Sequence, residues 1–219
     1  SNQVSRFLSA HRQSSPVLPT FFTRLTTVTR IIAGAIGSLQ LKPAAKATRP
    51  TSDRVKESLF AKLDAMGVIE GARVLDLFAG TGALGLEAAS RGAEQVTLVE
   101  RDRKAFELLQ ENVKNAKSAL AKQGFAPELR AVNVAAQRFL EGDSGGFDLV
   151  FLDPPYEIDH ESVAKMYSAL HLRLNEDALL VFERSSRARF DLPEDLKLLT
   201  EKSYGDTILM FIKRKEYSL

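Results

Sequence analysis

Cysteine is absent from the 219 residues, so the chain can form no disulfide and offers no thiolate ligand to a metal. The same absence excludes every mechanism that depends on a cysteine nucleophile. A chain without cysteine also suits a reducing compartment, and we expect the protein to be cytoplasmic.

Histidine and long apolar runs are also scarce. The three histidines, His11, His160 and His171, lie far apart without the spacing of metal ligands, so we expect no metal. No stretch approaches the roughly 20 apolar residues of a membrane span, and we expect no membrane association. Hydrophobic residues nevertheless make up 44% of the chain, enough for one sizeable core.

Charge is distributed unevenly along the chain, although the net charge is only +2. Residues 1–63 hold ten lysines or arginines against Asp53 and Glu57, which gives +8, whereas the other 20 basic and 26 acidic residues give −6. This asymmetry favours a polyanion-binding end attached to an acidic body. A solvated basic tail is the alternative.

A short apolar run followed by glycines organises the rest of the chain. Val74 to Phe78 is typical of a strand buried on both faces, and a helix is expected to begin near Ala83. Gly80 and Gly82, in the loop between them, can adopt backbone angles closed to other residues and let a ligand approach the main chain. This order of strand, glycines and helix predicts a nucleotide-type pocket.

Two cofactors fit such a pocket. The glycine spacing also matches the dinucleotide-binding fingerprint, with Glu100 at the end of the next strand where a ribose-binding acid would stand. Asp76 favours the other cofactor, because a carboxylate at the end of the first strand could hold a cationic amino-acid group, which pyridine nucleotides lack. Asp76 and the residues that follow it resemble the first motif of S-adenosylmethionine-dependent methyltransferases. The expected cofactor-binding residues are Asp76, Phe78, Ala79, Gly80, Thr81, Gly82, Glu100 and Arg101.

Strands and helices are expected to alternate along the chain after the glycine loop. We expect helices at 82–91, 103–122, 135–140 and 161–172, and further strands at 95–100, 129–134, 147–153, 178–183, 197–203 and 207–213. Alternation of this kind predicts an α/β fold with a doubly wound parallel sheet. The last two strands lack an intervening helix and should form an antiparallel C-terminal hairpin, which resembles the seven-stranded, Rossmann-like methyltransferase sheet and argues against a dehydrogenase.

Three regions are expected along the chain. Residues 1–27 show no sustained period and are predicted to form a flexible arm, residues 28–67 a basic hairpin and helix, and residues 68–219 the catalytic domain. The hairpin should centre on Gly34 and Gly37. The helix should be capped by Thr51 or Ser52 and end at Gly67. Its apolar stripe is predicted to contain Val55, Leu59, Phe60, Leu63 and Met66, with Arg54, Lys56 and Lys62 on other faces.

The second informative stretch is the buried strand that ends in Asp153-Pro154-Pro155-Tyr156. Ligands of open parallel sheets bind beyond the carboxyl ends of the strands, so Asp153 and the glycine loop should border one crevice. The prolines donate no hydrogen bonds, which leaves the Asp153 side chain and the Pro154 carbonyl as acceptors for an exocyclic amine. Tyr156 can stack on a flat ring. The four residues are therefore the expected catalytic residues, although such a sequence can also simply end a strand in a tight turn.

Several segments together resemble the RsmD type of bacterial 16S ribosomal RNA guanine-2-amino methyltransferases over about residues 28–215. They are Arg30-Ile31-Ile32-Ala33-Gly34, Arg49-Pro50-Thr51, Asp53-Arg54-Val55, Glu57, Leu59-Phe60, Asp76 to Gly82, Asp153 to Tyr156 and Tyr204-Gly205-Asp206-Thr207. The resemblance implies methylation of one guanine in 16S ribosomal RNA by S-adenosylmethionine, within a 30S particle or an assembly intermediate. We expect a monomer whose RNA-binding residues are Arg30, Lys42, Lys46, Arg49 and Arg54.

The sequence departs from this family's pattern in two places. The acid that often follows the third strand, and can receive the adenine amine of the cofactor, is replaced by Ala135. The hairpin is also less basic, with Ile36, Ser38 and Gln40 where lysine or arginine is frequent. A methyltransferase for DNA adenine or for a protein side chain remains an alternative, as does a non-catalytic RNA-binding protein.

Overall fold

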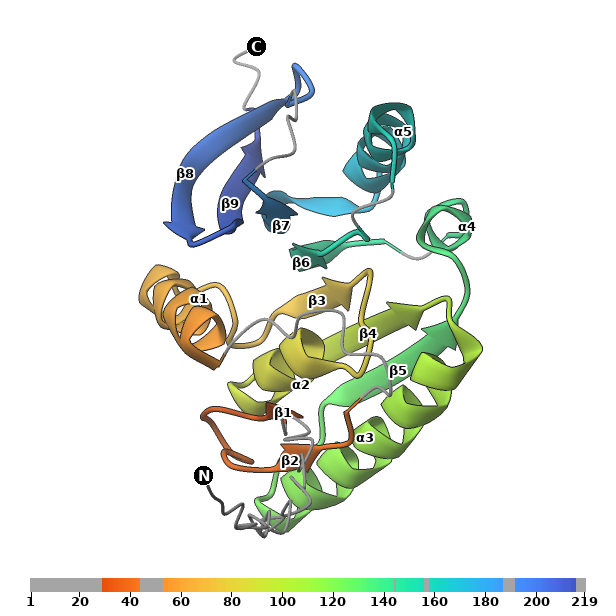
Figure 1. Cartoon of the computed structure of the whole chain (residues 1–219). Coiled ribbons are helices and arrows are strands. Elements are labelled where there is room, and N and C mark those ends of the chain that lie inside the picture. Colours follow the sequence, from red (N-terminus) through yellow and green to blue (C-terminus); the bar gives the residue numbers. More distant parts are fainter. Residues whose placement is uncertain (1–28, 44–52, 144, 156–157, 187–191, 216–219) are drawn as a thin grey trace, which may run out of the picture.

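The computed structural model describes residues 29–43, 53–143, 145–155, 158–186 and 192–215. Seven of its strands form one sheet, whose arrangement can be followed in Figure 1. The strand order is β5-β4-β3-β6-β7-β9-β8. Of these strands, β9 runs in the opposite direction to the other six. The strands are β3 (Arg73–Asp76), β4 (Gln95–Glu100), β5 (Glu128–Asn133), β6 (Phe147–Leu152), β7 (Leu174–Ser185), β8 (Leu196–Tyr204) and β9 (Thr207–Arg214). The predicted fold class is confirmed.

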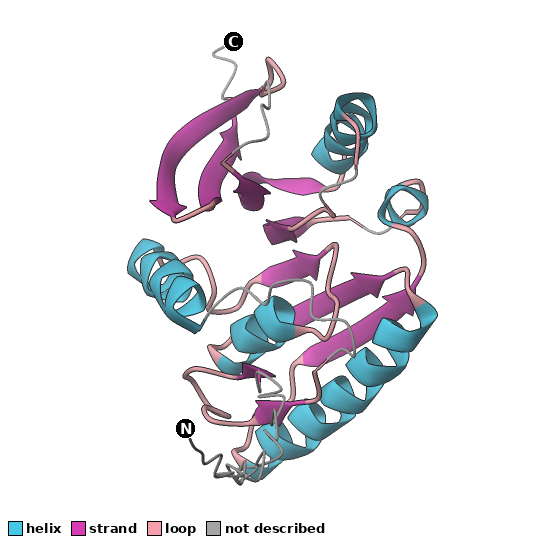
Figure 2. Cartoon of the chain, in the orientation of Figure 1, coloured by secondary structure: helices cyan, strands magenta, loops and turns pink. Residues whose placement is uncertain are grey.

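Helices cover both faces of the sheet, as a doubly wound fold requires (Figure 2). Successive residues of a strand point to opposite faces, so Val74 joins the hydrophobic cluster beneath the first three helices, whereas Leu75 joins the cluster beneath the other two. The first group comprises α1 (Asp53–Met66), α2 (Ala83–Ser90) and α3 (Arg103–Lys122), and the second comprises α4 (Ala136–Leu140) and α5 (His160–His171). This two-faced burial explains why the central strands are almost wholly apolar.

The strand and helix boundaries agree with the expected ones to within a residue or two, apart from β7. That strand begins at Leu174 rather than at Ala178 and ends at Ser185. Leu174 pairs with Phe147, and the register with β6 then shifts before Leu149 pairs with Leu179. The first part of this strand was not predicted, because the polar residues of the irregular stretch interrupt the hydrophobic pattern.

The N-terminal hairpin is present but short. Strands β1 (Thr29–Arg30) and β2 (Gln40–Leu41) pair antiparallel over two residues each, and the rest of the hairpin is a turn region in which Gly34 has a φ of 84°. Ile31 and Leu41 of the hairpin share one hydrophobic cluster with α1 and the sheet. The hairpin and α1 therefore pack onto the core that surrounds the seven-stranded sheet rather than around a core of their own.

Two expectations for α1 are wrong. Lys56 was expected on another face of the helix, but its side chain is 1% exposed and its Nζ donates to the carbonyl of Arg30 at 2.6 Å. Met66 was expected in the buried stripe, but it is exposed at the end of the helix. Lys56 is buried because α1 contacts the hairpin as well as the sheet, whereas Met66 is the last residue of the helix. The expected caps, Thr51 and Ser52, lie outside the described residues.

Within the described part of the chain, no helix combines the length and the apolar character that a membrane crossing requires.

Candidate active site

The candidate site lies at the carboxyl ends of the two adjacent central strands, β3 and β6. From β3 the chain adds β4 and β5 on one side, whereas β6 and β7 follow on the other, so the strand order reverses between β3 and β6. Open α/β sheets bind ligands at such a reversal. Asp76 of β3 is in register with Phe151 of β6, which places the glycine loop and Asp153 at the same edge of the sheet, as predicted.

The glycine loop leaves β3 and enters α2 with the backbone angles expected for it. Gly80 has a φ of 54° and Gly82 a φ of 90°, both in the left-handed region. A Cβ atom on Gly82 would lie 2.7 Å from the Leu109 side chain, whereas one on Gly80 would meet no atom within 4 Å. Gly82 therefore permits close packing, and the main chain at Gly80 is open to an approaching ligand. Phe78, Ala79 and Thr81 lie in the same loop.

Asp76 lies beneath this loop and is 3% exposed. Its Oδ2 accepts the backbone N–H of Gly85, at the start of α2, at 3.0 Å. Burial raises the pKa of Asp76 to about 7, because it outweighs the hydrogen bond from Gly85, and the nearby negative charge of Glu100 raises it further. The carboxyl group of Asp76 is thus a buried titratable group close to the loop.

Glu100, at the end of β4, contacts the same loop. Its Oε2 accepts the N–H of Gly80 at 2.9 Å and its Oε1 accepts the N–H of Asp102 at 2.6 Å. Each carboxylate oxygen has two lone pairs, so acceptor capacity remains on both. Arg101 follows as an exposed residue, and its carbonyl accepts a hydrogen bond from Asn133 at the end of β5. The expected cofactor-binding residues are therefore brought together at one edge of the sheet.

Ala135, where the resemblance would place an acid, is the residue before α4. It makes no side-chain capping hydrogen bond there. Asn133 is the nearest residue of β5 with a polar side chain, but its Nδ2 already donates to the carbonyls of Glu100 and Arg101, at 2.8 and 3.0 Å. It therefore orders the turn after β4.

Asp153, Pro154 and Pro155 follow directly after β6. Asp153 is exposed to solvent by its surface area, although many protein atoms lie close enough to its carboxyl group to desolvate it. This burial is the largest cause that raises the pKa of Asp153 to about 8, and the negative charges of Glu183 and Asp76 raise it further. The carbonyl of Pro155 accepts the N–H of Ile158 and so turns the chain towards α5. Tyr156 lies outside the described residues.

Glu183 is a residue of this site that the sequence analysis missed. Leu152 of β6 pairs in parallel register with Phe182 of β7, so the next residues, Asp153 just after β6 and Glu183 near the end of β7, stand side by side. The effect of Glu183 on the pKa of Asp153 agrees with this placement. An acid at the end of the strand beside Asp153 was the signal that could have revealed it.

The predicted RNA-binding residues fall into two places. Arg30 forms an ion pair with Asp53 at 3.3 Å and so lies near Arg54, which is exposed in the first turn of α1. Lys42 instead pairs with Glu111 of α3. These exposed pairs are weak and leave both cations able to exchange partners. The other two predicted residues, Lys46 and Arg49, lie outside the described residues.

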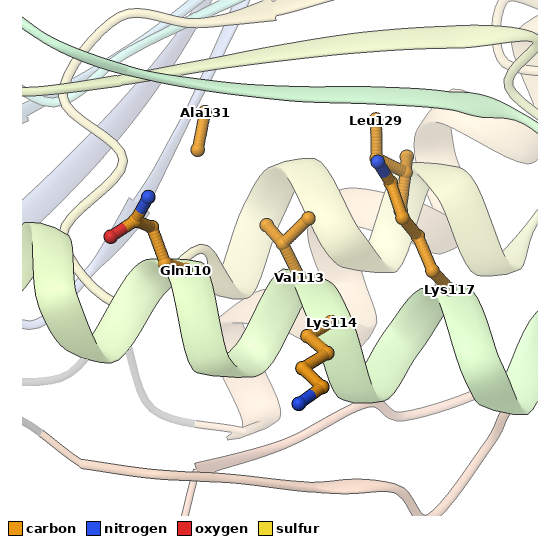
Figure 3. A pocket seen from close by; sticks show the side chains of 6 residues that line it. All are labelled: Gln110, Val113, Lys114, Lys117, Leu129 and Ala131. Carbon is orange, nitrogen blue, oxygen red and sulfur yellow. The ribbon is translucent and has the colours of Figure 1, made fainter.

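Two open hollows lie away from this edge of the sheet. The first, of about 390 Å³, is a space between α3 and β5 with Lys114 and Lys117 among its lining residues (Figure 3). The second, of about 440 Å³, lies near the amino ends of the central strands and is lined by Asp148 and Asp177, among others. The predicted site residues line neither hollow, so we assign the site from the strand ends and the glycine loop.

Metal chemistry finds no support in the described residues, because these contain no group of three histidine, aspartate or glutamate side chains that could hold an ion. The expectation that no metal takes part stays a prediction.

A seven-stranded sheet with this strand order, a glycine loop after its first strand and Asp-Pro-Pro after its fourth define a Rossmann-like methyltransferase. Residues 29–213 match the family described as "Conserved hypothetical protein 95", and the chain belongs to this family. The resemblance to RsmD-type methyltransferases is confirmed, and membership implies a methyl-donor cofactor.

Named relatives support this assignment. The chain is 36% identical over 191 residues to YlbH of Bacillus subtilis, covering 85% of this chain and 99% of YlbH. It is 35% identical to "Ribosomal RNA small subunit methyltransferase D" of Haemophilus influenzae, covering 80% of this chain and 89% of that protein. Among solved structures, the Escherichia coli protein yhhF superposes with a TM-score of 0.72 at 34% identity, covering 85% of this chain and 97% of yhhF.

Proposed function

We propose that this protein transfers a methyl group from S-adenosylmethionine to the exocyclic 2-amino group of a guanine in 16S ribosomal RNA, acting as a monomer on a 30S particle or an assembly intermediate. The observation that carries the proposal is that the glycine loop after β3 and Asp153-Pro154-Pro155 after β6 leave two paired parallel strands at the same edge of the sheet. The names of the relatives support ribosomal RNA as the substrate.

The residues around the glycine loop fit S-adenosylmethionine. The open space above Gly80 leaves room for the body of the cofactor, and Glu100 retains acceptor capacity for ribose hydroxyls. Asp76 supplies negative charge beneath the loop for the cationic amino-acid end, once it is ionised. When bound, the cofactor supplies an electrophilic methyl group on a sulfonium.

Asp153 and the Pro154 carbonyl would act on the other substrate. The amine of guanine is conjugated with its ring and is a poor nucleophile, so two acceptors that hold its hydrogens can aim the nitrogen lone pair at the methyl group. Because the pKa of Asp153 is about 8, the protonated form dominates at neutral pH and the stronger acceptor, the carboxylate, forms as pH rises. The ionised side chain would also attract the proton that the methylated amine releases.

Arg30, Lys42, Lys46, Arg49 and Arg54 would hold the RNA through its phosphates, which positions the substrate without reading its sequence. Each lost phosphate contact should flatten the plot of log affinity against log salt concentration by roughly 0.7 to 0.9. Neutralising Arg30 and Arg54 together should therefore reduce this slope and leave the affinity for S-adenosylmethionine unchanged.

The experiment that tests the function uses radiolabelled S-adenosylmethionine with three acceptors: naked 16S RNA, 30S particles from cells that lack this protein, and DNA. We expect label on a guanine 2-amino group, which nuclease digestion and chromatography of the nucleosides identify. Label on adenine of DNA would support the alternative methyltransferase. Saturable binding of NAD with none of S-adenosylmethionine would overturn the assignment.

A further inference from the structure

Asn112, in the middle of α3, is 1% exposed although its side chain is polar. Its Oδ1 accepts the backbone N–H of Lys42 at 2.8 Å. Its Nδ2 donates to the carbonyl of Lys42 at 3.2 Å and to the carbonyl of Thr81 at 2.9 Å. An N–H that needs an acceptor and two carbonyls that need donors allow only this orientation of the amide. One buried side chain thus joins the residue after β2 to the glycine loop.

The two ends of this connection belong to different parts of the proposed site. Thr81 stands between Gly80 and Gly82, in the loop that the proposed function assigns to the cofactor. Lys42 is a predicted RNA contact and precedes the segment that carries Lys46 and Arg49. The carbonyl of Thr81 and the backbone of Lys42 are therefore hydrogen-bonded to the same side-chain amide.

Other buried polar side chains hold the hairpin in place without a hydrogen bond to the glycine loop. Glu87 of α2 accepts the N–H groups of Ile32 and Ala33, at 2.6 and 3.1 Å. Ser90 of α2 accepts the N–H of Ile36 at 3.1 Å and donates to the carbonyl of Ala33 at 2.6 Å. These contacts reach the hairpin and not the glycine loop. Ser90 is therefore a matched control for Asn112.

We propose that Asn112 is a positioning residue that couples cofactor binding at the glycine loop to RNA binding at Lys42 and the residues that follow it. A cofactor that orders the loop fixes the Thr81 carbonyl, and Asn112 then fixes the backbone of Lys42. Such coupling is reciprocal, so RNA must raise the affinity for the cofactor by the same factor. The proposal rests on the proposed function, which assigns the two ligands.

The first test follows hydrogen exchange of individual amides in the full-length wild-type protein. Adding S-adenosylhomocysteine should slow exchange of the Lys42 amide, because this N–H donates to Asn112. The slowing should persist in Ser90→Ala and disappear in Asn112→Asp, which keeps the acceptor for Lys42 but loses the donor to Thr81. Wild-type protein that binds S-adenosylhomocysteine without any slowing at Lys42 would overturn the coupling and leave the methyltransferase proposal intact. Wild-type protein that binds no S-adenosylhomocysteine would overturn both.

The second test measures the dissociation constant of S-adenosylhomocysteine with and without saturating 30S particles from cells that lack this protein. We expect the particles to tighten binding at least about fivefold in the wild type. This factor should fall towards one in Asn112→Ala and keep its wild-type value in Ser90→Ala, although both variants lose buried hydrogen bonds and unfold at a lower temperature. A wild-type factor of one, or equal factors in the wild type and Asn112→Ala, would contradict the proposal.

Discussion

Replacing Asp76 by asparagine should stabilise the folded protein at alkaline pH and weaken its binding of the cofactor. Asparagine keeps an oxygen that can accept the N–H of Gly85 but removes a carboxylate that is costly to bury in its charged form. The same charge is the feature that the proposed function assigns to the amino-acid end of S-adenosylmethionine. Stability and binding are therefore expected to change in opposite directions.

The size of the stability change follows from the pKa of Asp76, which burial raises from 3.8 to about 7. A raised pKa means that the folded state holds the proton more tightly than the unfolded state. The stability that this tighter proton binding contributes is fully present below about pH 4 and is lost as pH rises to about 7. Each unit of difference between the folded and unfolded pKa corresponds to about 1.4 kcal/mol. The full loss is of the order of 4 kcal/mol, of which about 2 to 3 kcal/mol falls between pH 5 and pH 8.

Urea unfolding of the wild type and Asp76→Asn at pH 5, 6, 7 and 8 measures this effect as a difference between two curves. We expect the stability advantage of the variant to grow by about 2 to 3 kcal/mol over that range. Asp177→Asn is the control, because its carboxylate is exposed and should give a curve parallel to the wild type. Titration calorimetry at pH 8 should show weaker binding of S-adenosylmethionine by Asp76→Asn. Parallel curves for Asp76→Asn and the wild type would refute the reasoning.

Three further changes test other parts of the site. Asp153→Asn should slow methyl transfer by about 100-fold or more, with S-adenosylmethionine affinity nearly unchanged in calorimetry, and wild-type turnover would exclude Asp153 as the amine-binding group. The rate of methyl transfer by the wild type should rise with pH as Asp153 loses its proton near pH 8. In Glu183→Gln this rise should move to lower pH, because a negative charge beside Asp153 is gone. An unchanged pH profile would mean that Glu183 and Asp153 do not interact. Gly82→Ala should lower the melting temperature more than Gly80→Ala, because only the Gly82 substitution forces a Cβ atom against Leu109. Equal decreases in melting temperature would contradict this packing argument.

The sheet could be predicted because the information for it is local. Apolar runs of strand length alternate with amphipathic stretches, and the turn at Gly205 marks a hairpin without a helix. The glycine loop and the Asp-Pro-Pro turn follow their strands directly in the sequence. Once the parallel order was recognised, topology alone brought Asp76 and Asp153 to one edge.

The residues that escaped prediction act through contacts between distant parts of the sequence. Lys56 of α1 is buried because its ammonium meets the carbonyl of Arg30, 26 residues earlier. Asn112 meets Lys42 and Thr81 from 70 and 31 residues away. Polar residues on amphipathic helices are expected on the solvent side, and only the docked hairpin explains why these two are not. Glu183 was missed for a similar reason, since the register of two strands decides which side chains stand beside Asp153.

The net charge of +8 over residues 1–63 overstates the basic surface that the described residues offer to RNA. Arg30 and Lys42 lie beside carboxylates, and Lys56 turns inward. Among the described residues, the anchors of this region are backbone groups, which the buried side chains Glu87, Ser90 and Asn112 hold in place. Under the proposed function, charge would set how strongly this end of the chain attracts the RNA, and the contacts of Asn112 would set where a phosphate bound beside Lys42 lies relative to the glycine loop. On this argument the substitutions that remove charge should change the salt dependence of RNA binding, and substitution of Asn112 should change the rate of methyl transfer at saturating RNA.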